Sequence, residues 1–196
     1  MEKIKRWLKN LSMKKTLIVI GVVVVVIACA LVYLRIKAKS YSPEGNVEFS
    51  DGNLKIHVFY NRPYKKGRVI FGEGKLVPYG KTWRTGANEA TVFETSADLA
   101  FGDKTLKAGK YSLWTVPNEQ TWQVIFNSEI PSWGINFNGE ALRNLPTDAL
   151  VVEVPANHSQ EKEFEQFTIS VEKGSDGLEL NLFWDKTIVS VPFSVK

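Results

Sequence analysis

The sequence predicts an all-β fold, an antiparallel β-sandwich of the jelly-roll kind, preceded by one N-terminal transmembrane helix. Three observations support this prediction. An uncharged apolar run lies near the N-terminus, apolar residues alternate with period two through most of the remaining chain, and turn-forming residues separate the alternating segments. With 196 residues, the chain is long enough for one well-buried domain and short for two.

The apolar run is TLIVIGVVVVVIACALVYL, residues 16–34, and it contains no charged residue. As a helix it would be roughly 28 Å long, close to the hydrocarbon thickness of a bilayer. Valine is a poor helix former in water, but within lipid only a helix pairs all the backbone groups of a single segment. The sequence therefore predicts that residues 16–34 span a lipid bilayer, which is the first expected partner.

Charge is distributed unevenly on the two sides of this run. Residues 1–40 carry nine Lys or Arg and one acid, Glu2, whereas residues 41–196 carry 16 basic and 20 acidic residues. The basic residues that precede the run predict a cytoplasmic N-terminus, residues 1–15, and an extracytoplasmic C-terminal domain. Because that domain is mildly acidic, nucleic acid is not an expected partner.

The single cysteine, Cys29, lies inside the apolar run in the sequence VIAC, which resembles a bacterial lipoprotein processing site. Acylation at Cys29 is one alternative. The other is an inert thiol in a membrane helix, because the apolar run continues past it. A cleaved signal peptide is disfavoured, since its apolar core usually spans about 7 to 15 residues. No cysteine follows, so disulfides cannot stabilise the outer domain, which favours a bacterial, periplasmic cell-envelope protein.

Residues 35–46 form a polar linker containing Pro43 and Gly45, and residues 47–196 form the β-sandwich domain. Alternating apolar residues predict strands at residues 54–60, 121–127, 167–173, 178–184 and 187–195. With about nine or ten short strands at this spacing, a sandwich is the expected architecture. The least regular region, residues 127–148, is a long connection of the kind that often has a functional role.

Three segments resemble a known family: RVIFGEGKLVPYGKTWRTGANEATVF, LKAGKYSLWTVPNEQTWQVIFN and LNLFWDKTIVSVPF. Together they are similar to the bacterial domain of unknown function 2911, and the resemblance covers roughly residues 45–195. It implies an all-β extracytoplasmic domain and brings no established activity or cofactor with it. The family often follows a signal peptide, so a retained membrane helix would be a departure.

Candidate site residues are concentrated in the segment YGKTWRTGANEATVF, residues 79–93. Arg84 offers a fork of five hydrogen-bond donors, and Glu89 offers a carboxylate. One interpretation is a structural clamp, in which these side chains satisfy the backbone of a long loop. The other is a pocket for an anionic or polyhydroxylated ligand. The candidate ligand-binding residues are Tyr60, Arg62, Trp83, Arg84, Asn88 and Glu89.

The tryptophans allow a carbohydrate-binding interpretation, because sugar faces stack on aromatic rings. Trp122 and Trp184 fall on the apolar faces of their predicted strands and are expected in the core. Trp83 and Trp133 lie in irregular segments, where we expect them to plug loops because most large aromatic side chains are buried.

No catalytic signature is present. The chain has only two histidines, His57 and His158, no GxSxG motif and no zinc-binding pattern, so no metal or cofactor is expected. The expected function is binding of a glycan, a peptide or an envelope protein. One alternative is an envelope hydrolase with Glu89 as acid or base and Glu94 or Asp98 as the second carboxylate. The other is a purely structural envelope protein.

Overall fold

The computed structural model describes residues 13–196 of the chain, so the predicted cytoplasmic segment 1–15 lies largely outside the described residues. The chain divides into two compact units, Met1–Ser40 and Tyr41–Lys196. Among the described residues, the first unit contains the apolar helix and the second contains all the strands.

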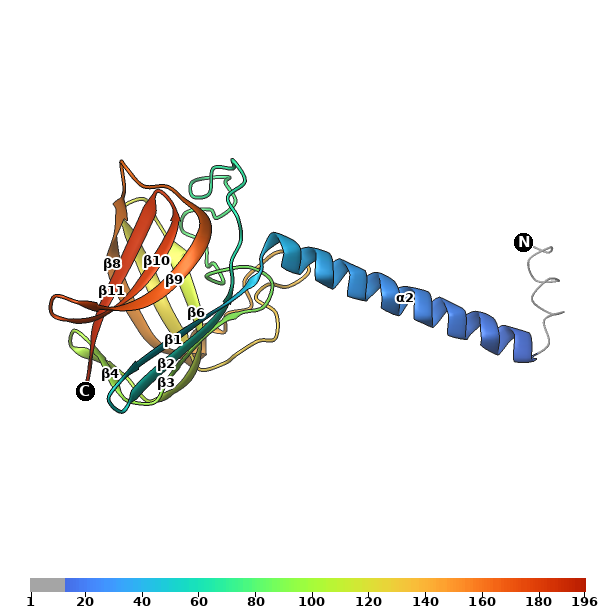
Figure 1. The fold of residues 1–196 in the computed structure, drawn as a ribbon, viewed down its shortest axis with the longest axis horizontal. Coiled ribbons are helices and arrows are strands. Elements are labelled where there is room, and N and C mark those ends of the chain that lie inside the picture. Colours follow the sequence, from blue (N-terminus) through green and yellow to red (C-terminus); the bar gives the residue numbers. More distant parts are fainter. Residues whose placement is uncertain (1–12) are drawn as a thin grey trace. The chain divides into compact units, whose positions relative to one another are not determined.

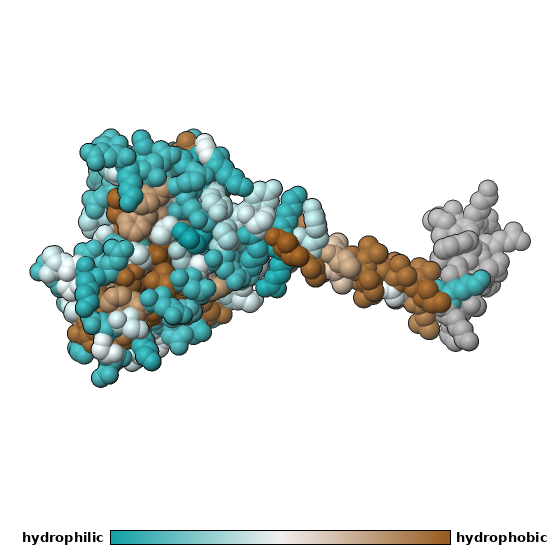
Figure 2. Space-filling model, viewed as in Figure 1, coloured by the Kyte–Doolittle hydropathy of each residue, from teal (hydrophilic) through white to brown (hydrophobic). Residues whose placement is uncertain are grey.

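The helix α2, Met13–Tyr41, contains the whole predicted span (Figures 1 and 2). Within the described residues, its segment Lys15–Tyr41 is long and apolar enough to cross a bilayer, and a signal sequence near an N-terminus has the same length and composition. Of the predicted linker 35–46, residues 35–41 continue the helix because Arg, Lys and Ala favour helical backbone. Pro43 then ends it, since proline disfavours helical backbone in the residue before it.

The described part of the second unit contains eleven strands and one short 3-10 helix, η1. All five strands predicted from alternation are present. The elements are β1 Glu44–Asp51, β2 Leu54–Asn61, β3 Thr91–Thr95, β4 Leu99–Phe101, β5 Lys104–Leu106, β6 Gly109–Pro117, β7 Thr121–Asn127, η1 Leu145–Thr147, β8 Asp148–His158, β9 Phe164–Gly174, β10 Gly177–Asp185 and β11 Thr187–Val195.

The strands form one antiparallel sheet in the order β1-β2-β3-β6-β7-β8-β11-β10-β9, with β4 and β5 paired beside β11. The sheet curls until its ends nearly meet, giving a barrel-like shape (Figure 1). Where the ends approach, Tyr64 bridges to Gln166, and the Phe167 amide donates to the Pro63 carbonyl at 2.9 Å. The predicted all-β antiparallel class is confirmed, and the opposed walls of the curled sheet correspond to the two layers of the predicted sandwich.

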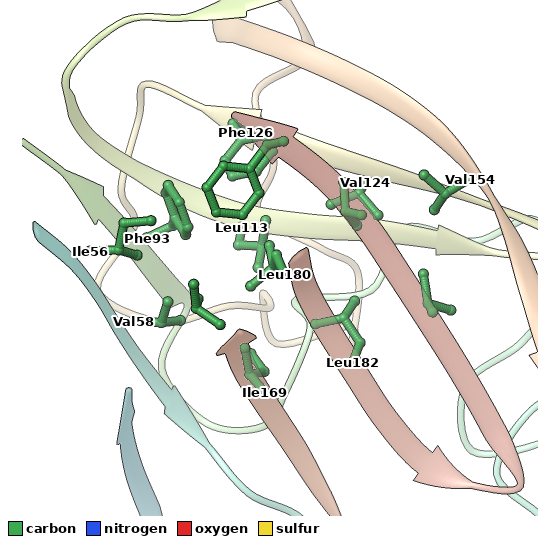
Figure 3. Close-up of a cluster of buried hydrophobic side chains, with 14 of the residues drawn as sticks. Ile56, Val58, Phe93, Leu113, Val124, Phe126, Val154, Ile169, Leu180 and Leu182 are labelled. Atoms are coloured by element: carbon green, nitrogen blue, oxygen red, sulfur yellow. The ribbon is translucent and has the colours of Figure 1, made fainter. Parts of the chain in front are cut away.

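The core lies inside this curled sheet (Figure 3). Alternate residues of each strand face inward, so Ile56, Val58 and Phe93 meet Ile169, Leu180 and Leu182 from the opposite wall. Trp122 and Trp184 are both 2% exposed, which confirms the prediction that they belong to the core.

A second buried layer lies on the outer face of β6 and β7. Trp114 and Ile125 are direct cross-strand partners and fully buried, yet they point away from the barrel core. Trp114 donates to Ser112 Oγ at 2.7 Å, and that hydroxyl donates to the Glu129 carbonyl at 2.6 Å. The connection after β7, residues 128–147, therefore covers this outer face, and we call it the covering loop.

Candidate functional site

The segment Trp83–Ala90 enters β3 through a sharply turned backbone. Thr85 and Asn88 have φ values of 52° and 56°, and Gly86 has φ 151°. A Cβ on Gly86 would lie 2.9 Å from the Asn61 carbonyl oxygen, so the end of β2 packs directly against this turn. Thr91 Oγ1 donates to the Thr85 carbonyl at 2.7 Å and fixes the turn on β3.

Trp83 points into the barrel and closes its end. Its backbone pairs with Thr115, and its ring stacks on Trp184 with centroids 5.7 Å apart. Phe167 lies edge-on at 4.9 Å, and Trp83 Nε1 donates to the Gly86 carbonyl at 3.0 Å. Trp83 therefore packs as a plug, and its indole N–H is already used within the turn.

Tyr60 and Arg62 join β2 to β9, where the sheet nearly closes. The Ile169 amide donates to Tyr60 Oη at 3.0 Å, and burial raises the pKa of the Tyr60 hydroxyl above its usual value. Arg62 donates from Nε to the Phe167 carbonyl at 3.3 Å and from Nη2 to Thr168 Oγ1 at 3.0 Å. Both side chains thus bond across the seam of the barrel.

Glu89 lies beside the end of β2. The fully buried Asn61 donates from Nδ2 to Glu89 Oε2 at 2.9 Å. The other carboxylates considered for hydrolysis lie elsewhere on the sheet. Glu94 is further along β3 and pairs with Lys110 at 3.4 Å, whereas Asp98 accepts hydrogen bonds from Lys107 and from the Ala108 amide.

Arg84 and Asn88 differ from these residues because each has a buried donor without an acceptor. Arg84 Nε and Asn88 Nδ2 are both inaccessible to solvent, and neither makes a hydrogen bond. Burial lowers the pKa of the Arg84 guanidinium from its usual value, which is the sign of a charge taken out of water. Uncompensated buried donors of this kind are rare in folded proteins.

The covering loop places Gly134 directly over these two residues. The Gly134 amide donates to the Asn88 carbonyl at 3.1 Å. A Cβ on Gly134 would lie 2.2 Å from Arg84 Cδ, so the aliphatic part of the arginine passes where a side chain would be. The structure thus brings Arg84 and Asn88 together under the loop, whereas Tyr60 and Arg62 are engaged in the seam.

Sequence reasoning did not find the residues that hold the covering loop. Asn127, fully buried at the end of β7, donates from Nδ2 to the Asn144 carbonyl at 2.6 Å and to Asp148 Oδ1 at 2.8 Å. Its Oδ1 accepts from the Glu129 amide and from Thr147 Oγ1. Only the length and irregularity of the segment indicated a special role, because nothing local marks Asn127 or Gly134 as contacts.

One surface hollow of about 310 Å³ lies apart from this site, over β1, β2 and β3. Its lining includes Glu48, His57 and Glu94, and His57 Nε2 lies 3.1 Å from Asn46 Oδ1. Within residues 13–196, no three His, Cys, Asp or Glu side chains are grouped so that they could hold a metal ion.

A family model matches residues 42–193, which cover nearly all of the barrel, and the family is described as a protein of unknown function (DUF2911). No curated protein and no solved structure matches the chain. The comparisons therefore establish the kind of domain, and they assign it no ligand, activity or partner.

Proposed function

The chain belongs to the DUF2911 family of proteins of unknown function, and we propose that it is a membrane-tethered, extracytoplasmic module that binds an anionic ligand at Arg84 and Asn88. The single observation behind this proposal is the pair of buried donors without acceptors, Arg84 Nε and Asn88 Nδ2. An unmade hydrogen bond of a buried donor costs about 1–3 kcal/mol, and more for a charged group. A buried donor without an acceptor is most easily explained where a bound ligand supplies the missing acceptor.

The chemistry of the donors indicates the class of ligand. A guanidinium recognises carboxylates and other oxyanions best, because its parallel N–H groups match two oxygen atoms. Asn88, which also contacts Gly134, would add a further amide donor. We therefore infer a small carboxylate, or the carboxylate of an acidic sugar or peptide, as the ligand.

Access to the donors requires movement of the covering loop. Its base is fixed by Asn127, and over the site its backbone is bonded through Gly134 to Asn88. Opening that one contact would expose Arg84 while the base of the loop stayed in place. Loops over binding sites commonly move in this way while the scaffold stays rigid.

The proposed tether is α2, with the segment before it in the cytoplasm and the barrel outside. The basic residues before the apolar run favour this orientation by the positive-inside rule. A tethered binding domain then samples ligands in the envelope, next to the membrane.

A ligand panel tests the proposal on the full-length chain in nanodiscs. Acetate, succinate and glucuronate serve as probes, and neutral glucose is the matched control for glucuronate. We expect the carboxylates to raise the melting temperature of the wild type and of the control variant Lys81→Met. That variant removes an exposed charge from residues 79–93, the segment that contains Arg84. The rise should disappear in Arg84→Met. If no carboxylate shifts the wild type, or if the shift survives in Arg84→Met, the proposed site is wrong.

The hydrolase alternative receives less support from the geometry. It requires a second carboxylate across a cleft from Glu89. The two that the sequence offered, Glu94 and Asp98, are instead bonded to lysines elsewhere on the barrel. The purely structural alternative predicts that Arg84 variants lose stability.

A further inference from the structure

We propose that the covering loop is a second membrane contact, inserting Phe137 and its apolar neighbours into the interface of the bilayer that α2 spans. This inference rests on the proposed tether. It concerns a surface of the barrel, and it is independent of whether Arg84 binds an anion.

The covering loop exposes more apolar surface than its role as a cover requires. Phe137 is 112% exposed, the largest exposed fraction among the large hydrophobic side chains of the described residues. Four further large apolar side chains of the same loop are also exposed: Ile130, Trp133, Leu142 and Leu145. Exposed apolar side chains concentrated in one segment are a feature of binding surfaces for a protein or a membrane.

The loop presents Phe137 on a rigid tip. Ile135 bridges to Ala141, and the Asn136 amide donates to the Glu140 carbonyl at 2.9 Å. Asn136 Oδ1 accepts from the amides of Asn138 and Glu140 at 2.9 and 3.0 Å. The exposed phenyl ring is therefore held out by a hydrogen-bonded turn, and its exposure is built into the local structure.

The charge pattern of the loop suits a lipid interface. Residues 130–139, IPSWGINFNG, contain no charged residue. The nearest carboxylates are engaged in hydrogen bonds within the loop, since Glu140 accepts from Asn136 Nδ2 and Glu129 accepts from Asn144 Nδ2. Trp and Phe are residues that occupy the headgroup region of bilayers, where an apolar ring can be buried beside polar groups.

Chain connectivity favours a bilayer over other partners. The Arg62 amide donates to the Pro43 carbonyl, and Glu44 pairs with Asn61, which contacts the Gly86 turn. The same turn bonds to Gly134 of the covering loop through Asn88. The covering loop thus lies at the end of the barrel where the chain arrives from α2.

The distance from the bilayer to this end of the barrel is short. Leu34, the end of the apolar run, and the buried Ser42 are eight positions apart along the chain. Because residues 35–41 are helical, they extend only about 12 Å at 1.5 Å per residue. A tether of that length keeps the barrel within reach of the membrane surface, so even weak apolar contact between the loop and lipid would be effectively intramolecular.

Single-cysteine variants labelled with the environment-sensitive fluorophore NBD test this inference. The full-length chain is reconstituted in liposomes of equal parts phosphatidylcholine and phosphatidylglycerol, with nitroxide-labelled lipid as quencher. One label is attached to native Cys29 and reports whether α2 lies in the bilayer. In a Cys29→Ser background, the second label sits at Asn138→Cys on the loop tip, and the third at Asp176→Cys. Asp176 lies in the turn between β9 and β10, which follows the end of β9 remote from Phe167.

We expect the label at position 138 to emit at shorter wavelength and to be quenched several-fold more strongly than the label at position 176. Adding Phe137→Asp should reduce that quenching to the level of position 176, because a charge at the tip opposes insertion. If Cys29 is quenched while positions 138 and 176 behave alike, the tether stands and the loop contact is wrong. If Cys29 is not quenched, both the tether and the loop contact are overturned.

Discussion

Two arginines on neighbouring segments illustrate opposite uses of the same side chain. Arg62 donates to Phe167 and Thr168 and joins the two ends of the sheet. Arg84 lies under Gly134 with its Nε buried and unbonded. The first arrangement stabilises the fold, whereas the second leaves one buried N–H of a charged group without an acceptor.

We therefore predict that replacing each arginine by methionine has opposite effects on stability. Arg62→Met should lower the free energy of unfolding by about 1.5–3 kcal/mol, because hydrogen bonds to a charged group are lost. Arg84→Met should leave it unchanged or raise it by about 1 kcal/mol, because a buried donor without an acceptor disappears while the aliphatic packing on Gly134 is retained. Urea unfolding at neutral pH measures both. A loss of about 2 kcal/mol or more in Arg84→Met would instead support the structural clamp.

At the scale of the element, the covering loop is held by one buried polar cluster at its base. Arg143 donates to both carboxylate oxygens of Asp148, from Nε at 3.0 Å and from Nη2, and Asn127 donates to Asp148 Oδ1. Burial alone would raise the pKa of the Asp148 carboxyl. The hydrogen bonds from Arg143 and Asn127 outweigh that effect, so the pKa is lowered from its usual value.

A lowered pKa in the folded state has a definite consequence for stability against pH. The contribution of Asp148 is fully present above its unfolded pKa of about 3.9, and it is lost as pH falls through the lower folded value. We predict that Asp148→Asn lowers the free energy of unfolding by about 1–3 kcal/mol at neutral pH. The difference from wild type should shrink as the pH falls below about 4. Asp176→Asn, in an exposed turn, is the control and should differ little from wild type across the same range.

A difference between wild type and Asp148→Asn that does not depend on pH would show that the ionised carboxylate contributes nothing at the base of the loop. Urea unfolding at several pH values distinguishes the two results. Because Asp98 and Glu163 also have lowered pKa values, only the difference between variant and wild type isolates Asp148.

The sequence predicted elements well and contacts between elements poorly. Strands such as 178–184 were predictable because a sheet with one buried face imposes period two on its residues. Trp114 shows the limit, since it is buried on the outer face and covered by a loop that alternation does not detect. The role of Trp83 as a plug followed from residue type, because most large aromatic side chains are buried. The same expectation for Trp133 is wrong, since that side chain is 40% exposed. The cover over Arg84 could not be predicted, because it depends on Gly134, fifty residues away.

At the scale of the whole molecule, the chain consists of two units, an apolar helix and a barrel. The side chains of α2 along the apolar run are exposed in the described chain, whereas the barrel has its own core of inward-facing residues and its own hydrogen-bonded seam. Nothing in that core comes from the helix. The free energy of unfolding of the barrel should therefore depend on residues 41–196 alone. The helix α2 should determine only where the barrel is located.

This separation gives a prediction about truncation. The fragment 41–196 should unfold in one cooperative transition, with the same midpoint as the barrel of the full-length chain in nanodiscs, because α2 contributes no buried apolar surface to it. Tyr60→Phe is the matched internal control. It removes the hydroxyl that accepts from the Ile169 amide across the seam and should lower the free energy of unfolding by about 1–2 kcal/mol in fragment and full chain alike.

Urea unfolding followed by tryptophan fluorescence reports on the barrel, because Trp122 and Trp184 lie in its core. A fragment that is markedly less stable than the full chain would mean that the bilayer itself supports the barrel. That result would be consistent with contact through the covering loop, and Phe137→Asp in the full chain should then reproduce the loss. Equal stability together with quenching of the label at position 138 would show that the loop meets the lipid without the fold depending on it.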